Sequence, residues 1–306
     1  MISPEEGAPG AGEAVLLAAV DDPRSAAHGA SVRLDARDAL LCAVGVALVA
    51  FNMRTAVASV PPVLGHFGLG GGGQSLLTTI PVLAFGAGAF AGPALRDRAG
   101  EEVAIFALML GLLGGLVARA LWPGWALFPA TLLAGLAVAL LNVLLPSLVK
   151  RRFPVRAAAL MAAYPAVMTI GSSLAAAGTV PVLHASSLHW ALGIWALPLL
   201  LGIAVWLPQL RGQPPSRARS RSRLPLPIWR TPLAWQVMLT MGLNSLIFYG
   251  EFSWLPTIYR ERGLSDAQAG LLLSALSLIG LVGNIAAPLI AARLPTQRPV
   301  VAAIVA

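Results

Sequence analysis

Residues 61–98 read PPVLGHFGLGGGGQSLLTTIPVLAFGAGAFAGPALRDR, and residues 256–293 read PTIYRERGLSDAQAGLLLSALSLIGLVGNIAAPLIAAR. The two stretches align without a gap at an offset of 195 positions, and ten of the 38 aligned pairs are identical. The identical pairs include Pro61 with Pro256 and Gly68 with Gly263, which a shared apolar composition does not explain. A long internal repeat in a hydrophobic chain is typical of secondary transporters, in which two similar helical bundles enclose a site.

The composition predicts a membrane protein. Apolar residues make up 57% of the chain and charged residues 11%, and the mean hydropathy is +0.78. Runs of about 20 apolar residues cross a ~30 Å hydrocarbon core as helices, and these runs lack the alternation of barrel strands. We place eight spans at about 39–63, 75–95, 102–121, 126–149, 156–182, 188–208, 232–259 and 267–292, with a ninth that begins near Pro299.

The basic residues predict the orientation of these spans. With a cytoplasmic N-terminus, 17 of the 21 basic residues fall in inner segments, and three, Arg119, Arg260 and Arg262, fall outside. This bias follows the positive-inside rule. We therefore expect a multi-pass protein of the plasma membrane, the bacterial inner membrane, with the lipid bilayer as a partner. The charges lie at the ends of spans, so no nucleic-acid partner is expected.

The predicted domains follow from the spans and from the basic segment between them. Residues 1–37 are expected to form a disordered cytoplasmic tail and 38–208 a complete N-terminal six-helix bundle. Residues 209–231 combine four prolines with six arginines and are predicted to be a cytoplasmic linker. Residues 232–306 would form a partial C-terminal bundle of helices 7 and 8 and the start of helix 9. The expected fold class is an all-α membrane protein, truncated at the C-terminus.

Catalytic and cofactor motifs are not found in the sequence. The only lysine, Lys150, is outside any phosphate-binding loop pattern. The four histidines are His28, His66, His184 and His189, and none lies in the middle of a predicted span. We therefore expect no enzyme activity, no cofactor and no metal site.

Two charged residues lie inside predicted spans and indicate a site. Arg54 is in the first span and Glu251 in the seventh. An intramembrane charge is costly and is expected to face a cavity or a partner. At the repeat offset Arg54 aligns with Tyr249, so both halves place polar groups at similar depth. Arg54 is predicted to bind an anionic or polar substrate, with Tyr249 and Glu251 on the opposite wall. Alternatively, Arg54 and Glu251 form an ion pair between the bundles, or Glu251 faces the outer interface.

Further polar residues extend this candidate site. Asn244 and Glu251 are seven residues apart, as are Ser277 and Asn284, so each pair shares a helix face. Asn142 and Tyr164 are isolated polar residues in the fourth and fifth spans. Substrate contact and ordinary hydrogen bonding between helices both explain such residues. We predict substrate-binding roles for Arg54, Asn142, Asn244 and Tyr249, and coupling or ion pairing for Glu251.

Several segments resemble one transporter family. They are Asn52-Met53-Arg54, TTIPVL at 78–83, NVLLPSLVKR at 142–151, WLPQL at 206–210, PLAWQV at 232–237, MGLNSLIFY at 241–249, RGLS at 262–265 and AGLLLS at 269–274. On these motifs the chain resembles the cyanate and 2-nitroimidazole transporter family of the major facilitator superfamily. The resemblance implies twelve helices in two six-helix bundles, alternating access, and small anions or heteroaromatic solutes as substrates.

The chain departs from the family pattern at three places. Position 244 is usually Gln in the family and here is Asn, and Glu251 stands where relatives tend to be apolar. In the loop after the second helix, residues 97–100 fit the superfamily pattern Asp-Arg-x-Gly, but Glu101 and Glu102 replace the basic pair that follows. The intracellular latch that the superfamily builds from this loop is therefore not carried over to this chain.

These observations predict a secondary active transporter of a small anionic or polar heteroaromatic solute, with protons as a candidate coupling ion. Two alternatives belong to other classes. The first is a truncated, non-transporting membrane protein or sensor derived from such a transporter. The second is an intramembrane enzyme, against which the lack of mid-span histidine and aspartate argues.

Overall fold

The structure is a computed structural model that describes the backbone of residues 36–210 and 232–291. Every regular element in these ranges is helical, so the predicted all-α fold class is confirmed. The predicted N-terminal tail and linker lie almost wholly outside the described residues, and the ninth helix from Pro299 lies entirely outside them.

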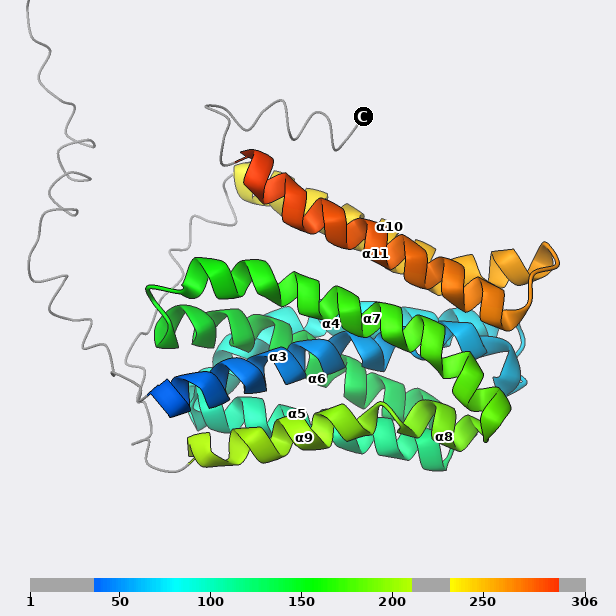
Figure 1. The fold of residues 1–306 in the computed structure, drawn as a ribbon, viewed down its shortest axis with the longest axis horizontal. Coiled ribbons are helices and arrows are strands. Elements are labelled where there is room, and N and C mark those ends of the chain that lie inside the picture. The colour runs from blue at the N-terminus through cyan, green and yellow to red at the C-terminus, as the bar shows by residue number, and fades with distance from the viewer. Residues whose placement is uncertain (1–35, 211–231, 292–306) are drawn as a thin grey trace, which may run out of the picture. The chain divides into compact units, whose positions relative to one another are not determined.

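Nine α-helices and two short 3-10 helices make up the described part of the chain (Figure 1). The α-helices are α3 (Ala36–Ala58), α4 (Gly71–Ala99), α5 (Glu101–Leu121), α6 (Leu127–Arg152), α7 (Ala157–Ala185), α8 (Leu188–Gly193), α9 (Ala196–Trp206), α10 (Pro232–Glu261) and α11 (Asp266–Ala291). The 3-10 helices are η1 (Pro61–Phe67) and η2 (Leu207–Leu210). Among the described residues, five helical segments of 21–27 residues are long and apolar enough to cross a bilayer.

Proline explains two of the differences between the predicted spans and the observed helices. The span predicted at 39–63 ends at Ala58, because Pro61 and Pro62 disfavour a continued α-helix and begin η1 instead. The span predicted at 188–208 is divided into α8 and α9. Pro198 has no N–H to donate to the Ile194 carbonyl. The Leu197 N–H donates to Ile194 O instead, at 3.1 Å, which is a tighter turn than that of an α-helix.

The internal repeat is visible in the backbone. Gly68 has a φ of 64° and Gly263 a φ of 91°, so the two aligned glycines both adopt the left-handed turn that precedes a helix. The helices that follow, α4 and α11, begin at aligned positions, Gly71 and Asp266. The sequence repeat therefore corresponds to a repeated turn and helix in the structure.

The main hydrophobic core lies among α3, α5 and α6, with Trp206 of α9 buried against it. Helix α7 contacts α3 on one side and α11 on the other (Figure 1). Both contacts need glycine: an added Cβ at Gly171 would lie 2.6 Å from Phe51 O, and one at Gly270 would lie 2.5 Å from Ala176 O. Small residues therefore permit close helix packing on both sides of α7.

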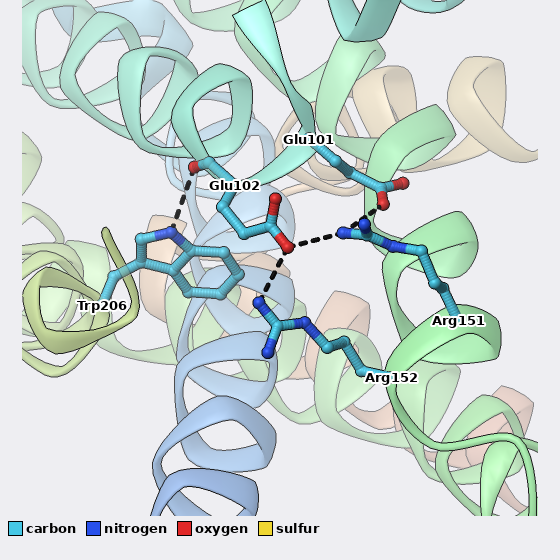
Figure 2. A network of polar contacts seen from close by, with 5 residues as sticks. All are labelled: Glu101, Glu102, Arg151, Arg152 and Trp206. Atoms are coloured by element: carbon cyan, nitrogen blue, oxygen red, sulfur yellow. Dashed lines mark hydrogen bonds and ion pairs between the residues drawn. The ribbon is translucent and has the colours of Figure 1, made fainter. Parts of the chain in front are cut away.

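A buried ion-pair cluster joins the first turn of α5 to the last turn of α6, and Figure 2 shows its side chains. The Arg151 guanidinium lies 2.9 Å from a Glu101 carboxylate oxygen and 2.5 Å from Glu102 Oε1. The same Glu102 oxygen accepts a hydrogen bond from Arg152 at 2.8 Å. Trp206 Nε1 donates to the Glu102 backbone carbonyl at 3.3 Å.

The signs of these charges suit the helix ends that carry them. Carboxylates are favoured at a helix N-terminus and guanidinium groups at a C-terminus, because of the helix dipole. The two acidic residues that depart from the superfamily pattern therefore contact basic residues of a neighbouring helix. The side chains of Asp97 and Arg98 lie outside the described residues.

Candidate functional site

A cavity of about 470 Å³ lies among α3, α6, α7, α10 and α11. This volume falls in the range of small-molecule sites, which are mostly apolar with a few placed polar groups. The walls are mainly apolar, and the polar residues in them come from both halves of the repeat. These polar residues are Arg54, Asn142, Tyr164, Thr169, Ser172, Glu251 and Ser277.

Arg54 of α3 lies against aromatic rings of α10. Its guanidinium carbon is 4.7 Å from the centre of the Phe248 ring and 5.5 Å from the centre of the Tyr249 ring. Such cation–π contacts contribute about 0.5–2 kcal/mol each. None of the ion pairs formed among the described residues involves Arg54. The guanidinium therefore keeps its hydrogen-bond donors available to a ligand in the cavity.

The aromatic residues around Arg54 pack against one another. Phe248 packs edge-on against Tyr249 with ring centres 5.3 Å apart, and it stacks on Phe252 at 5.7 Å. Tyr249 also packs on Phe85 of α4, with ring centres 5.4 Å apart. Tyr249 is partly buried and does not itself form part of the cavity wall. Tyr249 is therefore connected to the cavity by its contact with Arg54.

Asn142 and Tyr164 contact each other at the cavity wall. The Tyr164 hydroxyl donates to Asn142 Oδ1 at 3.4 Å and also lies 3.5 Å from Met53 Sδ. Asn142 Nδ2 donates to the Val138 carbonyl at 3.1 Å within α6. The hydrogen bond between helices that was one interpretation of these residues is present, and both side chains also line the cavity.

The two predicted residues of α10 lie in different surroundings. Glu251 is exposed and lines the cavity, and no ion pair among the described residues joins it to Arg54. Asn244 is exposed and is not part of the cavity wall, although it lies seven residues from Glu251. Ser277 of α11 lines the cavity and donates to Leu273 O at 3.0 Å, whereas the Asn284 side chain lies outside the described residues.

Sequence reasoning named Tyr164 of α7 but missed Thr169 and Ser172 of the same helix and the role of Phe248. Thr169 and Ser172 line the cavity, and their hydroxyls donate to the Pro165 and Thr169 carbonyls at 2.9 Å. Together with Pro165 and Met168 they are spaced three or four apart on one helix face. That spacing of polar residues within an apolar span was a signal available in the sequence.

Comparison with known proteins identifies the family. Residues 42–306 match the model of the Major Facilitator Superfamily. The chain belongs to this superfamily. It is 36% identical over 279 residues to the 2-nitroimidazole transporter of Escherichia coli, covering 89% of this chain and 71% of that protein. It is 30% identical over 250 residues to the cyanate transport protein CynX of the same organism, covering 80% of this chain and 65% of the relative. The resemblance inferred from the sequence motifs is therefore confirmed.

Two further comparisons concern the length and the fold. The chain is 33% identical over 266 residues to the uncharacterized transporter YycB of Bacillus subtilis, covering 85% of this chain and 66% of that protein. The chain thus spans about two thirds of the length of these relatives. Its fold is similar to that of the D-xylose-proton symporter, with a TM-score of 0.57 at 15% identity, covering 83% of this chain and 68% of that one. The likeness to this solved structure concerns the helical fold alone.

Proposed function

We propose that the protein is a secondary active transporter that moves a small anionic or polar heteroaromatic solute across the plasma membrane by alternating access. The observation that carries the proposal is Arg54, a cation with no ion pair among the described residues, at the wall of a cavity that both halves of the repeat line. The names of the relatives, which refer to cyanate and 2-nitroimidazole, support this solute class.

Each cavity residue has a proposed role in binding. The Arg54 guanidinium would donate two parallel hydrogen bonds to an anion or nitro group, a geometry to which its planar fork is suited. The Phe248 ring would offer an apolar face to a flat solute. Asn142 would bond to a polar edge of the solute, and Tyr249 would hold Arg54 in place. Asn244 remains a proposed solute contact, in a conformation in which α10 has moved relative to the cavity.

Glu251 is proposed as the coupling residue. It lines the same cavity as Arg54 without pairing with it, so its carboxyl is open to protonation from the cavity. Protonation and release during the cycle would then link solute movement to a proton gradient. A gradient-driven uptake that persists unchanged in Glu251→Gln would exclude this role.

The proposed function is tested by flux through proteoliposomes that contain the purified protein. We expect saturable uptake of labelled cyanate or 2-nitroimidazole above that of protein-free liposomes, with each solute competing against the other. A protein that binds the solute but gives no flux in either direction contradicts the proposal. That result would favour the sensor or non-transporting alternative.

A further inference from the structure

A second buried arginine lies outside the cavity of Arg54. Arg119, in the last turn of α5, is 1% exposed. Its Nη1 donates to the Ala56 carbonyl at 2.9 Å, and its Nη2 donates to Ser59 Oγ at 3.1 Å. Ala56 is in the last turn of α3, where carbonyl groups have no partner in their own helix. The sequence places Arg119 at the outer end of the predicted span 102–121, where its complete burial is unexpected.

The charge of Arg119 is only partly compensated. The C-terminus of α3 carries roughly half a negative charge, which favours a cation there. No carboxylate among the described residues pairs with Arg119. Its Nε is buried and has no hydrogen-bond partner among those residues either. A buried charge is costly unless it is paired and hydrogen-bonded. The guanidinium therefore retains both positive charge and an unused donor.

A small cavity of about 20 Å³ has Arg119 in its wall. Its other polar residues are Thr78 of α4, Thr131 of α6 and Ser253 of α10. The Thr78 hydroxyl donates within its own helix, to Gln74 O and Ser75 O. Thr131 Oγ1 is buried and has no partner among the described residues, and Ser253 is 8% exposed. The volume is sufficient for a single small particle, either a water molecule or a monatomic anion.

We propose that this cavity binds one small monovalent anion of about the size of chloride, held by Arg119 together with the hydroxyls of Thr131 and Ser253. All three groups can donate hydrogen bonds, and the arginine adds a positive charge, so the chemistry favours an anion over a cation or a neutral molecule. Thr131 and Arg119 belong to the first half of the repeat and Ser253 to the second. The bound anion would therefore stabilise the contact between the two halves.

The test is the unfolding midpoint of the purified protein in sodium chloride, bromide and gluconate at equal ionic strength. Chloride and bromide should raise the midpoint by about 3 °C or more in a saturable manner, since a ligand that binds only the folded state stabilises it. Gluconate should not, because it is too large for the cavity. Equal midpoints in chloride and gluconate would mean that water alone occupies the cavity, and would overturn the proposal.

Variants distinguish anion binding in this cavity from anion binding in the cavity of Arg54. Thr131→Val and Ser253→Ala remove one hydroxyl each without changing the charge, and each should reduce the chloride response. Thr79→Val alters an exposed threonine outside the cavity and should leave the response intact. Arg54→Gln should also leave it intact. A response that is lost in Arg54→Gln but kept in both hydroxyl variants would place the anion in the other cavity and contradict the proposal.

Discussion

Arg54→Gln is expected to reduce solute uptake by about 10- to 100-fold at solute concentrations below saturation. A hydrogen bond to a charged group contributes roughly 1.5–3 kcal/mol, and about 1.4 kcal/mol corresponds to a tenfold change in binding. Glutamine is of similar polarity but lacks the charge, and so removes the proposed anion contact while leaving the aromatic wall in place. The measurement is the initial rate of labelled cyanate or 2-nitroimidazole uptake, normalised to the amount of protein in the membrane.

Two further variants make this result specific. Arg54→Lys keeps the charge but loses the planar fork and its stacking on Phe248, so its uptake should lie between that of the wild type and that of Arg54→Gln. Arg262→Gln removes an exposed arginine outside the cavity and should transport like the wild type. If Arg54→Gln and Arg262→Gln transport equally well, Arg54 does not bind the solute.

Glu102→Gln is expected to have the largest effect on stability. Glu102 Oε1 contacts both Arg151 and Arg152, and the Glu102 side chain is 7% exposed (Figure 2). Removing one partner from a buried ion pair costs about 3–5 kcal/mol, because the charge left behind stays buried, and the Arg152 side chain is only 8% exposed. We expect the unfolding midpoint of the purified protein to fall by roughly 5–10 °C.

The matched control for this prediction is Glu261→Gln at the end of α10. Glu261 is exposed, and an exposed substitution of this kind changes stability by less than about 0.5 kcal/mol. The midpoint of Glu261→Gln should therefore stay near that of the wild type. Equal midpoints for the two variants would show that the cluster at α5 and α6 contributes little to stability.

The sequence was sufficient to predict the helical fold and its repeat. Long apolar runs have few alternatives in a bilayer, because their backbone groups must be paired internally. The aligned Gly68 and Gly263 marked a turn that the structure repeats. The division of the sixth span, which lies just before Pro198, was not predicted, because hydropathy does not register the loss of a single backbone donor.

The sequence predicted those residues of the candidate site whose charge is costly inside a membrane span. A charge inside a span is rare enough to identify Arg54 and Glu251, and both line the cavity. Asn244 shares a helix with Glu251 but lies outside the cavity wall. Helical spacing predicts which residues lie on the same face of a helix, but it does not predict what that face contacts along its length. Arg119 was placed at the outer end of a span, and that position gives no sign that its side chain bonds to the end of α3.

The central claim, that the cavity of Arg54 holds the solute, is tested most directly by protection of a cysteine placed in its wall. The native Cys42 is buried, so the Ser277→Cys variant carries one accessible thiol among the described residues that line the cavity. Saturating solute should slow the reaction of this thiol with a small methanethiosulfonate reagent, and should not slow the reaction of Ser245→Cys, which is exposed outside the cavity. A Ser277→Cys labelling rate that is unchanged by solute, at concentrations that saturate uptake, would contradict the account.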